Sequence, residues 1–207
     1  MPGQGRDGRY HHGDLRAALI GAAIEIIGER GVRGFTLAEA SRRLGVASSA
    51  PYAHFADRDE FLAAVAVHGY ELFNEQFLPE VREFTAPADR LAAGARAYVR
   101  FAGTHRPLFE VIFVAGLDQA SRPEVKAADK PFHDTYMGSV RALSGGEGPE
   151  ADDLAAAVEA VAYGHARLLL EGDYGHGGEA IELAAERAAR ATRALVESRH
   201  LLRRPAH

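Results

Sequence analysis

Apolar residues recur every three or four positions along almost the whole chain, and glycine or proline falls between the periodic segments. This spacing predicts amphipathic α-helices, while the alternating β-branched runs that indicate strands are missing. The first helix is bounded by Asp14, a candidate N-cap, and Gly31, and its apolar stripe consists of Leu15, Leu19, Ala22, Ala23, Ile26 and Ile27. Later helices are predicted over 88–104, 108–114, 124–143, 151–171 and 179–200. The fold class is therefore all-α.

A short helix, a bend at glycine and a second short helix follow the first helix. Thr36 and Glu39 have the spacing of a capping box, so a helix begins after Thr36 and stops at Gly45. Ser48 or Ser49 can cap the next helix, which runs to residue 54. This layout is typical of a helix-turn-helix, whose second helix enters the major groove of DNA. On spacing alone, an αα corner in any helical protein fits equally well.

A second capping box marks the point at which the chain divides into two domains. Asp57 and Glu60 form this box at the start of a long amphipathic helix, which Pro79 should bend or end. We therefore expect an N-terminal arm and helix-turn-helix domain over 1–56, and a helical domain over 57–207.

The composition excludes several classes of protein. Hydrophobic residues make up 47% and charged residues 26% of the 207 residues, which argues against a disordered or fibrous chain. Cysteine is absent, which excludes disulfides, thiolate metal sites and a cysteine nucleophile. No apolar stretch approaches the roughly 20 residues that cross a bilayer, and the first residues lack the apolar core of a signal peptide. We expect a cytoplasmic protein with no membrane partner.

The charge is unevenly distributed along the chain. Residues 1–56 contain seven arginines and five acidic residues, a balance of +2, although the whole chain carries a net charge of −5. A mildly basic N-terminal segment followed by an acidic remainder of the chain is consistent with DNA binding. It is also consistent with an ordinary solvated surface. An N-terminal arm containing Arg6 and Arg9 can reach the minor groove, or can be a terminus without a role.

Four motifs at fixed spacing over roughly residues 10–65 resemble the N-terminal domain of the TetR family of transcriptional regulators: Phe35-Thr36-Leu37, Leu44-Gly45-Val46, Pro51-Tyr52-Ala53-His54-Phe55 and Arg58-Asp59-Glu60-Phe61-Leu62. The preceding Tyr10-His11-His12-Gly13-Asp14-Leu15-Arg16 resembles the opening of a subgroup whose C-terminal domain is called WHG. The resemblance implies a homodimeric, ligand-responsive repressor. An N-terminal three-helix unit would bind a palindromic double-stranded operator, and a C-terminal domain would hold a small-molecule effector.

The resemblance also implies roles for individual residues of the helix-turn-helix. Thr36 and Arg58 would meet phosphates, Ser48, Ser49 and Ala50 would face the groove, and Tyr52 and His54 would contact the DNA backbone. The chain departs from the family pattern at Ala47, where Ser or Thr is frequent, and at Ala53, where a larger and often basic residue is frequent.

Aromatic, sulfur and polar side chains gather in the middle of the chain. The resemblance implies a cavity there, whose candidate ligand-binding residues are Tyr98, Phe101, His105, Phe109, Phe113, His133, Met137, Tyr163 and Arg167. Phe132, Tyr136 and His165 belong to the same group. The alternative is that most of them are simply core, as stripes at helical spacing usually are. We expect neither a metal nor a cofactor.

The last two predicted helices carry faces of small and branched residues that suit close helix packing. We expect these faces to form a symmetric four-helix dimer interface through Ala155, Val158, Ala162, Leu169, Ala184, Ala188, Ala191 and Leu195. The alternative is packing of the same faces within one chain.

An enzyme is disfavoured because no His-x-x-x-His cluster, phosphate-binding glycine loop or Gly-x-Ser-x-Gly elbow occurs in the chain. A helical dimeric adaptor that acts through protein contacts remains the alternative. It would keep the dimer interface while leaving the exposed face of residues 48–54 without a DNA partner.

Overall fold

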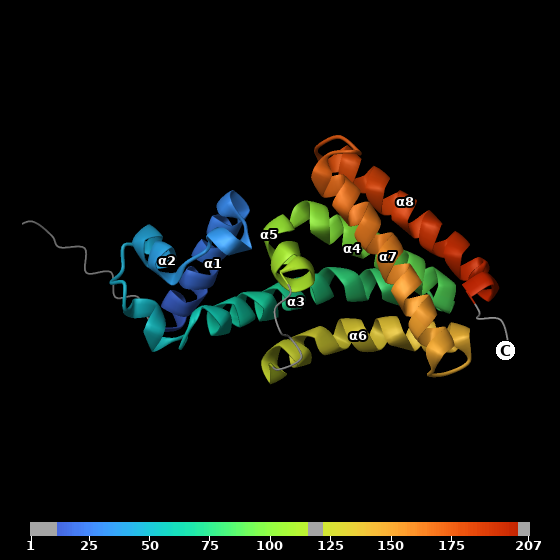
Figure 1. Ribbon diagram of the computed structural model, residues 1–207, viewed down its shortest axis with the longest axis horizontal. Coiled ribbons are helices and arrows are strands. Elements are labelled where there is room, and N and C mark those ends of the chain that lie inside the picture. Colours follow the sequence, from blue (N-terminus) through green and yellow to red (C-terminus); the bar gives the residue numbers. More distant parts are fainter. Residues whose placement is uncertain (1–11, 116–121, 203–207) are drawn as a thin grey trace, which may run out of the picture.

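The computed structural model describes residues 12–115 and 122–202, and all regular elements in these ranges are helical (Figure 1). The prediction of an all-α fold is confirmed. The α-helices are α1 His12–Arg30, α2 Leu37–Leu44, α3 Arg58–Arg82, α4 Pro87–Thr104, α5 Arg106–Phe109, α6 Pro123–Ser144, α7 Pro149–Glu171 and α8 Gly178–Glu197. Short 3-10 turns occur at η1 Val32–Gly34, η2 Ala50–Ala53 and η5 Arg199–Leu202, and η3 Glu110–Val114 is a π-helical turn.

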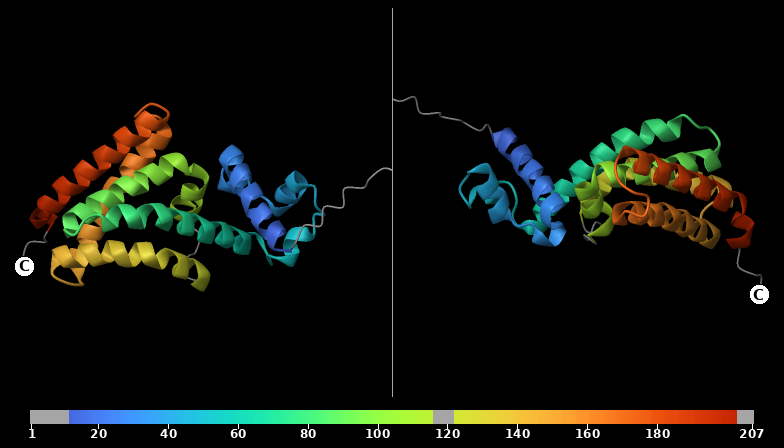
Figure 2. Two further views of the ribbon diagram at one scale, coloured as in Figure 1. Left: turned by 180° about the vertical axis from the view of Figure 1, so that it is seen from behind. Right: turned by 90° about the horizontal axis from the view of Figure 1, so that it is seen from above.

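The chain forms two lobes joined by one long helix. Figures 1 and 2 show α1 and α2 at one end of α3, and the helices from α4 to α8 around its other end. The proposed arm with Arg6 and Arg9 lies outside the described residues. Within the described ranges, no helix combines the length and apolar content that a membrane span requires.

Local sequence explains the N-terminal lobe. α1 begins at His12, two residues before the expected cap Asp14, and it ends before Gly31, whose φ of 70° suits glycine. The Thr36 hydroxyl caps α2 by accepting a hydrogen bond from the backbone N–H of Glu39 at 3.2 Å. Gly45, with φ 67°, ends the same helix in the left-handed conformation.

α3 belongs to both lobes. Near its start, the Phe61 ring lies 5.0 Å from Phe35 and 4.3 Å from Phe55 in the N-terminal core. More than three helical turns further along α3, Phe73 and Phe77 pack in the C-terminal core, where both rings contact Phe132. A boundary at residue 56 therefore coincides with the start of α3, but the first turns of this helix pack with the residues before it.

Pro79 does not end α3 where it stands. The helix continues to Arg82, three residues beyond the proline, because Pro79 is exposed and lies in the last turns of the helix. Removing one backbone N–H there affects only one carbonyl of the preceding turn.

In the C-terminal lobe, α4 lies against α3, α6, α7 and α8. Gly103 of α4 allows α8 to pack closely against α4, since a Cβ at this position would lie 2.7 Å from Cγ1 of Ile181 in α8. At the edge of this contact, Arg100 donates hydrogen bonds to Glu80 of α3 and Glu182 of α8. The guanidinium of Arg100 holds the pKa of the Glu182 carboxyl below its ordinary value. These ion pairs tie three helices together.

The helix expected over 108–114 has a more complex form. A single turn, α5, is followed by the π-helical turn η3, in which the N–H of Ala115 donates to the carbonyl of Glu110 at 2.8 Å. The apolar run in this segment does not encode the wider turn, so periodicity alone could not predict it.

Loss of the α3 cap should destabilise the protein. Asp57 accepts a hydrogen bond from the N–H of Glu60 at 2.8 Å, and the Glu60 carboxylate accepts one from Ala56 N at 2.6 Å. We expect Asp57→Ala to lower the free energy of unfolding by about 1 kcal/mol, measured by urea denaturation. Glu75→Ala, at an exposed position further along α3, is the control and should change it by less than about 0.5 kcal/mol. Equal losses in the two variants would contradict the capping role.

Candidate functional site

The second helix of the helix-turn-helix is a single 3-10 turn. η2 covers only Ala50–Ala53, and it closes through a hydrogen bond from Tyr52 N to Ser49 O at 3.1 Å. Ser49 occupies the N-cap position, but its side chain makes no capping hydrogen bond. The expected side-chain cap is therefore absent, because Ser49 has helical rather than extended backbone angles.

Two buried residues hold this turn on the lobe while its polar side chains face outward. Pro51 and Phe55 are buried, and the guanidinium of Arg16 lies 5.4 Å from the centre of the Phe55 ring. Ser48 and Ser49 are exposed, and Tyr52 is 60% exposed. Ala50 and His54 are half-buried at the base of the turn. The turn thus presents two hydroxyls and one phenol to solvent.

Thr36 and Arg58 lie at the starts of α2 and α3. They differ in whether their hydrogen-bond donors are already engaged within the chain. The Thr36 hydroxyl accepts a hydrogen bond from Glu39 N, so its own proton remains available to an acceptor. The Arg58 guanidinium donates to the carbonyls of Val32 at 2.7 Å and Phe35 at 3.3 Å. Arg58 therefore clamps the start of α3 to the connection between α1 and α2.

The arginines of α2 are matched by acidic residues within the same lobe. Arg42 donates to the Glu39 carboxylate at 2.6 Å, and Arg43 donates to Glu29 at 2.6 Å and to Glu25 at 3.3 Å. These hydrogen bonds lower the pKa of the Glu29 and Glu39 carboxyls. Arg42 and Arg43, two of the seven arginines counted in the N-terminal sequence, are thus paired with acidic residues in the fold.

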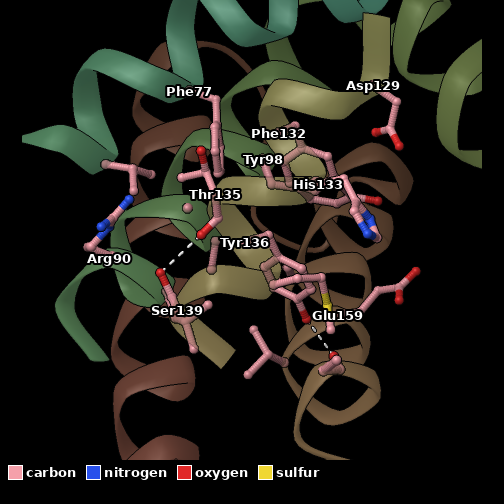
Figure 3. A pocket seen from close by; sticks show the side chains of 18 of the residues that line it. Phe77, Arg90, Tyr98, Asp129, Phe132, His133, Thr135, Tyr136, Ser139 and Glu159 are labelled. Atoms are coloured by element: carbon pink, nitrogen blue, oxygen red, sulfur yellow. Dashed lines mark hydrogen bonds between the residues drawn. The ribbon is translucent and has the colours of Figure 1, made fainter. Parts of the chain in front are cut away.

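A cavity of about 400 Å³ lies in the other lobe, between α3, α4, α6, α7 and η3 (Figure 3). This volume falls in the range of sites that hold small molecules. Most of the wall is apolar or aromatic and consists of Tyr70, Phe77, Val81, Leu91, Gly94, Ala95, Tyr98, Ile112, Phe113, Phe132, Tyr136, Met137, Ala155, Val158 and Ala162.

The structure brings together four of the nine expected ligand residues. Tyr98, Phe113, His133 and Met137 line the cavity, as do Phe132 and Tyr136 of the same aromatic group. The five others lie outside its wall: Phe101, His105, Phe109, Tyr163 and Arg167.

The residues outside the wall have other contacts, which explain their placement. Phe101 and Phe109 are fully buried in the core, and the His105 ring stacks on Phe101 at 5.0 Å. Arg167 pairs with Glu171 on its own helix, and Tyr163 is exposed. His165 lies 2.5 Å from the Tyr174 hydroxyl, away from the cavity.

The polar residues of the wall form two groups at opposite ends of the view in Figure 3. One group consists of Arg90, Thr135 and Ser139, and the other of Asp129, His133 and Glu159. Of these six residues, only His133 is among those predicted from the sequence. The missed signal is helical spacing, since Arg90 precedes the cavity residues Gly94 and Tyr98 by four and eight positions.

Burial within the cavity wall changes the acid–base properties of several side chains, among them Asp129 and Tyr98. Desolvation raises the pKa of the Asp129 carboxyl, an effect opposed by His133. Burial also raises the pKa of the Tyr98 phenol, with a further contribution from the charge of Glu159. Tyr98 therefore stays protonated and can donate a hydrogen bond.

Five of the eight expected dimer residues are buried within the single chain. Val158, Ala162, Leu169, Ala184 and Ala188 are buried against the chain's own helices. Ala155, Ala191 and Leu195 are half-buried. The reason is that α4 covers both helices, so their small-residue faces turn inward.

The opposite faces of α7 and α8 remain open. Leu168 and Leu183 are each 43% exposed, and a Cβ added at Gly164, one turn before Leu168, would meet no atom within 4 Å. These outer faces carry apolar surface that nothing in the described chain covers.

Two family models match the chain. Residues 19–65 match the model described as "Bacterial regulatory proteins, tetR family", and residues 91–192 match the model described as "Tetracyclin repressor-like, C-terminal domain". The first match includes the start of α3, in agreement with its packing in the N-terminal core. No similar sequence is found among curated proteins.

Solved structures share the fold over nearly the whole chain. A protein of unknown function from Rhodococcus sp. RHA1 is 28% identical with a TM-score of 0.69, covering 91% of this chain and 98% of its own. AibR, solved with isovaleryl coenzyme A and operator DNA, is 19% identical with a TM-score of 0.66, covering 86% and 97%. RolR, solved with resorcinol, is 20% identical with a TM-score of 0.58, covering 94% and 95%.

A hydrogen bond at the cavity wall should contribute measurably to stability. The Tyr136 hydroxyl donates to Ala155 O at 2.6 Å and so joins α6 to α7 (dashed in Figure 3). We expect Tyr136→Phe to lower the free energy of unfolding by about 1 kcal/mol, measured by urea denaturation. Tyr163→Phe removes the hydroxyl of an exposed tyrosine on α7 and should have almost no effect. If Tyr136→Phe were equally silent, the bond would not support the wall.

Proposed function

The chain belongs to the TetR family of bacterial regulatory proteins, and we propose that it is a ligand-responsive repressor that binds a palindromic operator as a homodimer. The observation that carries the proposal is the exposed polar turn of Ser48, Ser49 and Tyr52, fixed on the N-terminal lobe by buried Pro51 and Phe55. Exposed hydroxyls on a rigid protruding turn suit contacts to phosphates and base edges.

The proposed DNA contacts follow from the exposure of this turn. Ser48, Ser49 and Ala50 face the major groove, and Tyr52 and His54 lie toward the sugar-phosphate backbone. Thr36, at the start of α2, donates to a phosphate through the hydroxyl proton that its capping bond leaves free. Arg58 supports the site mainly as a clamp, because its guanidinium already binds two backbone carbonyls.

We place the dimer interface on the outer faces of α7 and α8. Exposed Leu168 and Leu183 supply apolar area, and Gly164 lets a partner helix approach closely. To reach successive major grooves, such a dimer has to place its two η2 turns about 34–36 Å apart, one turn of B-DNA.

The cavity and the N-terminal lobe are connected through η3 and α5. Ile112 and Phe113 of η3 line the cavity, and Pro107 of α5 abuts α1, since a Cβ on Gly28 would lie 3.2 Å from its Cγ. A ligand that favours one position of η3 thus biases the position of α1. It releases the operator to the extent that it binds the released state more tightly.

Related structures support both halves of the proposal. AibR was solved with operator DNA and isovaleryl coenzyme A together, and RolR with resorcinol. We infer that this chain likewise responds to a small molecule, and that it resides in the cytoplasm, where the operator is. We propose no catalytic activity, since the matched family consists of regulatory proteins.

Operator binding should depend on Tyr52. In a gel shift with DNA from upstream of the protein's own gene, Tyr52→Ala should weaken binding by about tenfold or more, because a hydrogen bond to a charged phosphate is lost. The fold should be retained, as this side chain is 60% exposed. Leu201→Ala, which truncates a 75% exposed side chain on η5, is the control and should bind normally.

Two outcomes would contradict this assignment. Undiminished binding by Tyr52→Ala would remove η2 from the site. Wild-type protein without any salt-dependent DNA affinity would favour the adaptor alternative, since phosphate contacts release counterions on binding.

Dimerisation should depend on the outer face of α7. Leu168→Arg should shift the protein from dimer to monomer in sedimentation equilibrium at micromolar concentration, because it buries a charge in an apolar contact. Leu201→Arg introduces the same charge on η5, outside this face, and should leave the dimer intact. A wild-type protein that is monomeric at this concentration would overturn the proposed assembly.

A further inference from the structure

Arg90 has no anionic partner in the part of the chain that the structure describes. Its side chain lines the cavity, and its buried Nε makes no hydrogen bond. Other arginines of the same helix are paired, since Arg96 binds Glu80 and Glu186, and Arg100 is likewise held by acidic residues. Arg90 is therefore an exception among the arginines of α4.

Neither the adjacent acidic residue in the chain nor the acidic residues of the cavity wall form an ion pair with Arg90. Asp89, its neighbour in the chain, forms an ion pair with Arg193 of α8 instead. Asp129 and Glu159 belong to the opposite group of the cavity wall (Figure 3). Arg90 is half-buried, and an opposite charge stabilises a cation that is partly withdrawn from water. The cavity thus contains an uncompensated positive charge at one end.

Hydroxyl groups lie at the same end of the cavity. Thr135 and Ser139 share one face of α6, and Ser139 Oγ donates to the Thr135 carbonyl at 3.1 Å (Figure 3). The Thr135 hydroxyl keeps a proton to donate, so it can complete the coordination of an anion beside a guanidinium.

The charges of the whole wall limit the ligand to one negative charge. Arg90 is the only arginine or lysine among the lining residues that the structure describes, whereas Asp129 and Glu159 are acidic. A phosphate or a second carboxylate would bring more negative charge than one guanidinium compensates, and it would approach the acidic group. A single carboxylate matches the bidentate geometry of a guanidinium.

The remaining wall selects the body of the ligand. The wall also contains the aromatic rings of Phe77, Tyr98, Phe113 and Phe132. This surface favours a ring or a branched apolar chain over a polar body. We propose that the effector is a monocarboxylate with a compact aromatic or branched apolar body, and that Arg90 and Thr135 bind its carboxylate.

This inference rests on the proposed function and is tested separately from it. Purified full-length protein is titrated calorimetrically at pH 7.5 with matched pairs of carboxylates and their neutral amides, carrying phenyl, cyclohexyl and branched alkyl bodies. We expect at least one carboxylate to bind about tenfold or more tightly than its amide, because a charge-assisted hydrogen bond is lost in the amide.

The Arg90 variant separates an anion site from general apolar binding. Arg90→Gln should reduce the preference for the carboxylate to about onefold while leaving the amide affinity unchanged. Arg82→Gln, at an exposed position on α3 outside the cavity wall, should keep the wild-type preference. Circular dichroism checks that both variants are folded.

Three results would overturn the inference. These are the absence of a carboxylate preference across the whole panel, a preference that persists in Arg90→Gln, and tighter binding of phenylsuccinate, a dicarboxylate, than of 3-phenylpropionate. A gel shift without ligand tests operator binding on its own, so the carboxylate site can fail while the regulator assignment stands.

Discussion

The architecture depends on one continuous helix that is packed in two hydrophobic cores. α3 has 25 residues, which corresponds to about 37 Å at a rise of ~1.5 Å per residue. Phe61 anchors one end among the aromatic residues of the N-terminal lobe, and Phe73 and Phe77 anchor the other beside the cavity. Each lobe therefore packs around a different part of the same helix. This shared element connects the lobe that contains the cavity to the lobe that carries η2.

Local signals in the sequence predicted most of the helices. The residues that start and end α2, Thr36 and Gly45, act through their own backbone geometry, so the predicted range over 37–44 agrees with the structure. The form of η2 was not predictable in the same way. Pro51 is buried against the lobe and the turn is only four residues long, so tertiary packing rather than capping decides its conformation.

The cavity was only partly predictable because helical spacing identifies inward faces but not what they meet. Tyr98 and Phe101 both point away from solvent, yet one lines the cavity and the other is packed in solid core. Arg90 was missed because a charged residue on an amphipathic helix is normally assigned to solvent. The alanine-rich faces with Ala184 and Ala188 could not be assigned to a dimer or to a single chain without knowing that α4 covers them.

The paired arginines of α2 affect how such a regulator would search the chromosome. Arg42 and Arg43 are committed to glutamates of their own lobe, so they add little to the attraction for arbitrary phosphate backbones. A genome offers on the order of a million or more competing sites, and sequence-independent affinity comes almost entirely from unpaired cations. An N-terminal lobe with few unpaired cations would dissociate sooner from non-operator DNA. Shape and hydroxyl contacts would then contribute more to its sequence specificity.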